Sequence, residues 1–136
     1  MGIRANSGFS LVEVLVSIVI LAVALLGTAG LMASSLRNTN TAYYRSQATV
    51  LADDILDRMR ANLEAARDDG EYDIDVGPVC AASGGMPQYD CTEWTTNVAN
   101  TLPRGEGIVA VNGVGVVTIT INWDGGENSF TTQSRL

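Results

Sequence analysis

The chain has 136 residues, a formal net charge of −7, eight basic residues that are all arginine, and no histidine. This length suits one small domain plus one additional segment. The acidic balance disfavours nucleic-acid binding, and the lack of histidine removes the commonest general base and metal ligand. We therefore expect a protein that is not an enzyme and that uses no cofactor, no metal and no nucleic acid.

The first eight residues form a short polar segment in which Arg4 is the only charged side chain. The segment ends in Gly8, directly before Phe9. A carboxylate follows at Glu13. One possibility is cleavage directly after Gly8. A second is a secretory signal peptide, which would be cut after the apolar segment, where Ala22-Val23-Ala24 offers a site. A third is an uncleaved anchor in which Glu13 only marks where a membrane span begins.

The segment from Val14 to Leu36 has 23 residues without a charge. At a rise of about 1.5 Å per residue, such a helix crosses a hydrocarbon core of about 30 Å. An ionisable group at its head is costly in lipid and needs a partner. Cleavage after Gly8 would supply one, because the new amine of Phe9 on one subunit could pair with Glu13 of the next.

The arrangement of Gly8, Phe9 and Glu13 resembles the class III signal peptide of type IV pilins and pseudopilins. The resemblance implies a leader over residues 1–8, cleavage between Gly8 and Phe9, and N-methylation of Phe9 by a prepilin peptidase. It also implies that Glu13 is a contact between assembled subunits. Arg4 lies further from the cut than the basic residue of many such leaders.

Apolar residues recur at spacings of three and four beyond the span: Ala48, Leu51, Ala52, Ile55, Met59 and Leu63. This periodicity predicts an amphipathic helix, and no proline interrupts residues 9–67. We expect one nearly continuous helix from Phe9 to Arg67. Asp54 and Arg58 form an i, i+4 pair in the favourable order.

Acidic residues occupy every second position of residues 69–75. A solvated loop is expected over residues 68–75, and a calcium site is the alternative. Residues 76–92 are predicted to form a loop closed by Cys80 and Cys91, which have ten residues between them. In an oxidising compartment such a pair reads as a disulfide. Free thiols and metal ligation are the alternatives.

The last third of the chain predicts a short helix followed by strands. Residues 93–101 suit a helix that ends before Pro103, with Trp94, Val98 and Leu102 on the face that packs on a sheet. Strands are expected at residues 107–111, 116–123 and 127–133. The predicted fold class is α+β: a long N-terminal helix packed on a three- to four-stranded antiparallel sheet, the type IV pilin fold.

Further stretches are similar to PilV, the minor pilin family called type IV pilus modification protein. The likeness is densest over residues 8–62, including Arg45-Ser46-Gln47-Ala48 and Asp57-Arg58-Met59-Arg60-Ala61-Asn62, and it continues in Leu102-Pro103-Arg104-Gly105. The resemblance implies a low-abundance subunit that helps to prime pilus assembly with other minor pilins, the major pilin and the inner-membrane assembly platform. Because the subunit that caps such a complex typically lacks the glutamate, Glu13 suggests a position below the apex.

We therefore expect residues 9–36 to form the half of the helix that spans the membrane and later lies in the filament core. Within it, residues 14–36 would lie in lipid. Residues 37–136 would form a periplasmic domain that later lies on the extracellular pilus, since Arg4 and the initial amine precede the span. The alternative function is an I-type minor pseudopilin of a type II secretion system. A pilus-tip adhesin would use the Cys80–Cys91 loop and Tyr89.

Overall fold

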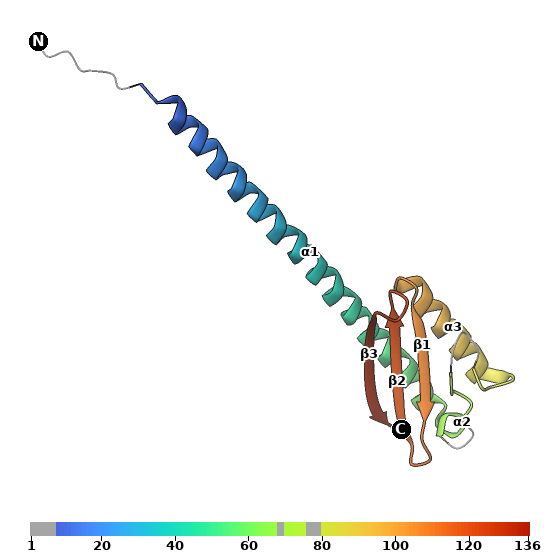
Figure 1. Ribbon diagram of the computed structural model, residues 1–136. Coiled ribbons are helices and arrows are strands. Elements are labelled where there is room, and N and C mark those ends of the chain that lie inside the picture. Colours follow the sequence, from blue (N-terminus) through green and yellow to red (C-terminus); the bar gives the residue numbers. More distant parts are fainter. Residues whose placement is uncertain (1–7, 68–69, 76–79) are drawn as a thin grey trace, which may run out of the picture. The chain divides into compact units, whose positions relative to one another are not determined.

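The computed structural model describes residues 8–67, 70–75 and 80–136. The chain divides into two compact units, one ending at Thr41 and the other running from Ala42 to Leu136. Helix α1, Leu11–Ala61, contributes to both units. The elements that follow are α2, Leu63–Arg67, α3, Gly85–Thr101, β1, Glu106–Val111, β2, Val116–Trp123, and β3, Asn128–Arg135. This order confirms the predicted α+β class (Figure 1).

The long helix ends earlier than predicted. Asn62 lies in a turn, and its backbone N–H is shared between the carbonyl oxygens of Arg58 and Met59, each at 3.2 Å. Asparagine favours turns over helix interiors because its side chain offers the backbone other hydrogen bonds. The break also ends the buried stripe of α1, so Leu63, the last residue of the predicted apolar face, is 43% exposed.

Helix α3 is longer than predicted. It begins at Gly85, so the expectation of a loop through Thr92 is wrong for the last eight of those positions. Pro87 lies in the first turn, where a missing N–H breaks no helical hydrogen bond. The helix ends at Thr101 before Pro103, as expected. The disulfide between Cys80 and Cys91 links α3 to the segment that precedes it.

The sheet is antiparallel with β2 in the centre, between β1 and β3. Strand β2 alternates as predicted, and its buried face carries Val117, Ile119, Ile121 and Trp123. This face joins the buried stripe of α1 and the apolar face of α3 in one core. The Trp94 ring nitrogen donates to the Leu51 carbonyl oxygen at 2.7 Å, which fastens α3 to α1.

Candidate functional site

The expected cleavage site lies just before the first helix. Gly8, Phe9 and Ser10 precede α1 and are exposed, and Phe9 is 84% exposed. The Ser10 carbonyl oxygen accepts the first helical hydrogen bonds, from the N–H groups of Glu13 at 3.0 Å and Val14 at 3.2 Å. The bond between Gly8 and Phe9 is therefore outside the helical ladder. A peptidase can bind such a segment without unwinding a helix.

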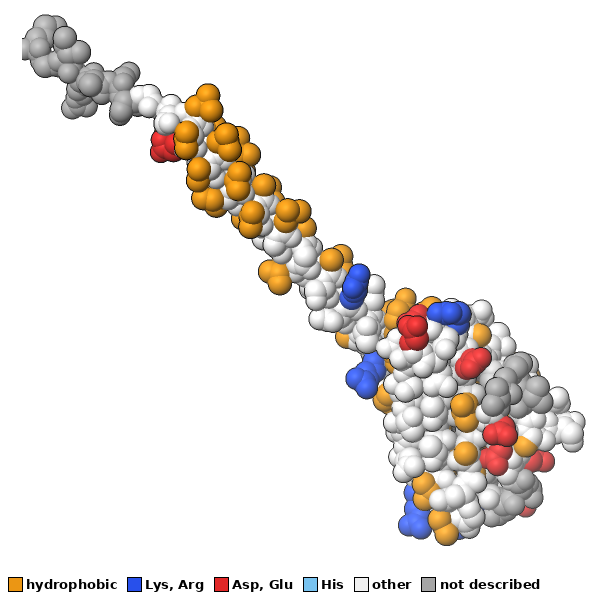
Figure 2. All heavy atoms as spheres, in the orientation of Figure 1, with side chains coloured by type: hydrophobic (Ala, Val, Ile, Leu, Met, Phe, Trp, Pro, Cys, Tyr) orange, Lys and Arg blue, Asp and Glu red, His pale blue; other side chains and the backbone are white. Residues whose placement is uncertain are grey.

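Glu13 lies in the first turn of α1 and is exposed. A carboxylate there is favoured by the positive end of the helix dipole. With Phe9 it lines a shallow groove of about 370 Å³ whose other residues are Val14, Ser17, Ile18 and Leu21. Among these six residues Glu13 alone is ionisable, so its carboxylate sits on a surface that is otherwise largely apolar (Figure 2).

The apolar segment is long and apolar enough to cross a membrane, by length and composition. Its side chains are exposed in the structure, as Leu26 at 74% and Leu31 at 74% show. Figure 2 shows apolar side chains all round the visible side of this part of α1. An isolated helix with this surface is unstable in water, so it requires lipid or other helices around it.

In the globular unit, a charged network joins α1 to α3. Arg58 contacts the carboxylates of Asp54 and Asp90 at 3.2 Å and of Glu93 at 2.7 Å. Sequence periodicity predicted the pair with Asp54, which lies on the same helix. The partners on α3 were not predicted, because they are more than 30 positions away in the chain and show no shared pattern.

The same network includes a buried tyrosine. The Tyr72 hydroxyl donates to Asp90 at 2.6 Å. Burial and this hydrogen bond raise the pKa of Tyr72 to about 12. Burial by itself would lower the pKa of Arg58. Hydrogen bonds to Glu93 and Asp54 together outweigh that effect, so the pKa of Arg58 is raised. The network fastens α3 and Tyr72 to α1.

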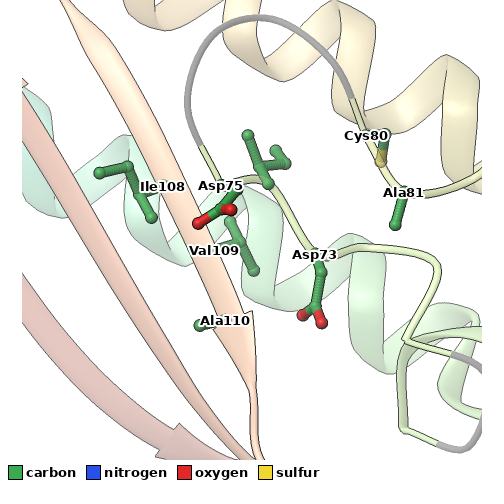
Figure 3. A pocket seen from close by; sticks show the side chains of 8 residues that line it. Asp73, Asp75, Cys80, Ala81, Ile108, Val109 and Ala110 are labelled. Carbon is green, nitrogen blue, oxygen red and sulfur yellow. The ribbon is translucent and has the colours of Figure 1, made fainter.

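A pocket of about 450 Å³ lies between residues 73–75, Cys80, Ala81 and the middle of β1 (Figure 3). Asp73 and Asp75 are its acidic residues, and one oxygen of Asp73 accepts the Val111 N–H at 2.9 Å. The calcium alternative also drew on Asp68 and Asp69, which lie outside the described residues. Within the described part of the chain, no group of three or more His, Cys, Asp or Glu side chains is placed to hold a metal ion.

Comparison with protein families gives one match, to the prokaryotic N-terminal methylation motif, over residues 3–29. The matched span includes Gly8, Phe9, Glu13 and more than half of the apolar segment. The chain therefore carries the N-terminal signature of a type IV prepilin-like protein. No curated protein and no solved structure matches the chain. The match ends at residue 29, before the stretches at 45–62 and 102–105.

Proposed function

We propose that this protein is a minor pilin that is cleaved between Gly8 and Phe9, methylated on the Phe9 amine and built into a type IV pilus. The observation that carries the proposal is the coincidence of an accessible Gly8–Phe9 bond with Glu13 inside a methylation motif. The resemblance of residues 45–62 to PilV supports a role in priming pilus assembly with other minor pilins and the major pilin.

The assembly step follows from the charges at the head of α1. Cleavage creates an amine on Phe9, four residues before Glu13. Each charge is costly inside a bundle of apolar helices unless it is paired. Two subunits offset along a fibre axis can pair the carboxylate of one with the amine of the other, which neutralises both. The pairing also sets the axial offset between neighbouring subunits.

The remaining partners follow from this route. A prepilin peptidase that also methylates would process the N-terminus at the inner membrane. Residues 14–36 would hold the subunit in that membrane, with the N-terminus in the cytoplasm and the domain in the periplasm, until the assembly platform moves it into the pilus. The role is structural and needs no catalytic group of this chain.

The direct test is the intact mass and N-terminal sequence of the protein purified from its own bacterial membranes. The proposal expects a chain that starts at Phe9 and carries one additional methyl group. A chain that starts at Met1 would indicate an uncleaved anchor, and one that starts after Ala24 a secreted domain. Either result would refute prepilin processing.

The role of Glu13 is tested by Glu13→Gln, which removes the charge and keeps the size. We expect normal cleavage but at least about a tenfold loss of the protein from sheared pili, since tenfold corresponds to only about 1.4 kcal/mol. Ser17→Ala is the matched control, because Ser17 lines the same groove and its hydroxyl donates to the Glu13 carbonyl oxygen at 2.7 Å. Equal incorporation of both variants would contradict the pairing.

Gene deletion separates the pilus from the secretion alternative. The proposal expects fewer surface pili and unchanged protein secretion. Loss of secretion with normal pili would instead identify an I-type minor pseudopilin, whose N-terminal processing would be the same.

A further inference from the structure

The two edges of the sheet differ. The outer edge of β1 is partly paired, since Ile74 and Val109 exchange backbone hydrogen bonds at 2.8 and 3.1 Å. The next outward N–H, that of Val111, donates to the Asp73 carboxylate. Figure 3 shows the chain near Asp73 and Asp75 beside this edge. The protein's own chain thus occupies part of the β1 edge.

The register identifies the backbone groups that point outward from β3. The backbone N–H and C=O of Val109 point toward Ile74, away from β2. The backbone groups of Ile119, which lies opposite Val109 on β2, therefore point away from β1 and toward Thr132 on β3. Because the direction alternates along antiparallel strands, the residues on either side of Thr132 face outward. The outward residues are Ser129, Thr131, Gln133 and Arg135. In the described part of the chain, no backbone hydrogen bond reaches their outward groups.

As far as the described residues show, strand β3 lacks the devices that usually protect an edge. It is eight residues long, pairs one-to-one with β2 without a bulge, and contains no proline, glycine or lysine. Its only charged residue is Arg135, the last of the strand. Natural edge strands are normally short, charged, bulged or covered, because an open edge pairs with other chains. An open edge with Phe130, Thr131 and Thr132 at its centre is suited to accept a strand.

The inner side of the same edge has uncovered apolar surface. Phe130 lies opposite Ile121 on the core side, but it is only half-buried whereas Ile121 is fully buried. A strand added beside β3 would cover the open side of Phe130 if it carried an apolar residue there.

The far end of β3 is basic although the chain is acidic overall. Arg135 is exposed on the outer face of the strand, and on the opposite face the Arg60 guanidinium donates to the hydroxyl of the preceding residue, Ser134, at 3.1 Å. Within the described residues, Arg60 pairs with one carboxylate, that of the exposed Asp57. A carboxylate on an incoming strand would be favoured at this end.

We propose that β3 is a docking edge for an extended strand of a different prepilin-type subunit, with an apolar residue beside Phe130 and a carboxylate near Arg135. The inference rests on the filament function proposed above. A second copy of this chain fits less well. Antiparallel pairing of two β3 edges would make the two copies of residues 42–61 run in opposite directions, and parallel pairing would place Arg135 beside its own copy.

The first test is photo-cross-linking of the full chain in its native membranes and in sheared filaments. A photoreactive phenylalanine analogue replaces Thr131, whose side chain would lie beside an added strand. The matched control position is Thr120, on the same sheet face but with β1 and β3 on its two sides. We expect an adduct from position 131 at least about tenfold stronger than from position 120, linked to an extended segment of another prepilin-type subunit.

The second test removes one outward N–H. Thr131→Pro does so at an edge position that tolerates proline, whereas Thr131→Ala removes the same side chain and keeps the N–H. With the photoreactive residue at Gln133, the proline variant should lose the adduct about tenfold and the alanine variant less than twofold. Retention of the Cys80–Cys91 disulfide is the folding control for the proline variant. If that variant fails to fold, the first test still decides, because the photoreactive residue at position 131 is placed in a chain without the proline.

The outcomes separate the two proposals. Equal adducts from positions 131 and 120, or an adduct that survives Thr131→Pro, would overturn the docking edge even if the protein is processed at Phe9 and found in pili. An adduct between two copies of this chain would overturn the choice of partner. An unprocessed protein with a strong adduct to another subunit would refute the pilin function and leave the edge standing.

Discussion

Replacement of Arg58 by methionine tests the charged network most directly. Methionine keeps the length of the apolar stem and removes the guanidinium. Two of the three ion pairs involve half-exposed acids, with side chains of Asp54 and Glu93 exposed by 39% and 43%, and each is worth about 0.2–1 kcal/mol. The third pairs Arg58 with Asp90, whose side chain is 10% exposed.

The pair with Asp90 should dominate the loss. A buried carboxylate left without its cation costs about 3–5 kcal/mol. Asp90 keeps the hydrogen bond from Tyr72, so we expect the lower end of that range, and about 3 kcal/mol for the variant as a whole. The matched control is Arg60→Met, since Arg60 is on the same helix and pairs with the exposed Asp57. Its cost should stay within about 0.5 kcal/mol.

The assay is urea unfolding of residues 42–136, the compact unit that contains the whole core, followed by the fluorescence of Trp94 and Trp123. A loss of about 3 kcal/mol corresponds to a midpoint lower by about 1–3 M. A double-mutant cycle with Asp90→Asn should give a larger coupling energy than a cycle with Glu93→Gln. A loss below about 1 kcal/mol, or a larger coupling to Glu93, would refute this reasoning.

Two further predictions concern the core. The raised pKa of Tyr72, about 12 beside Asp90, means that its neutral form stabilises the fold; this contribution is complete below pH about 10 and is lost as the pH rises toward 12. Tyr72→Phe should therefore weaken the decline of stability between those pH values, and an unchanged decline in urea midpoints would contradict the assignment. Gly107→Ala would drive a methyl group into the buried ring of Trp94 and should cost about 1–3 kcal/mol, whereas Gly113→Ala, with open space around it, should be near neutral by the same assay.

The N-terminal site could be predicted from the sequence because its information is local. Gly8, Phe9 and Glu13 lie within six positions, and the uncharged segment after them has the length of a membrane-crossing helix. Each feature depends on the order of residues and on solvent transfer, which need no tertiary structure. The family match over residues 3–29 agrees with that prediction.

Local patterns also predicted strand β2 at residues 116–123 and its buried face. Period-two alternation identifies such a strand whenever one face of the sheet is covered. The same kind of evidence failed at Asn62 and at the start of α3. The helix break at Asn62 accompanies a hydrogen bond from its side chain to the Tyr72 hydroxyl at 3.4 Å, a contact ten positions away.

Tertiary structure alone decided which partners meet across the fold. The contacts of Arg58 with Asp90 and Glu93, and of Trp94 with the Leu51 carbonyl, join positions separated by 32 to 43 residues. The open edge of β3 is likewise a property of strand order. Strands β1 and β3 are the two edges of the sheet, and Ile74 pairs with the edge of β1. Free energies of such contacts depend on distance and burial, which the order of residues does not state. The sequence by itself therefore determined the methylation motif and the length of the apolar segment, and the fold determined which backbone edge of the sheet is left unpaired in the described residues.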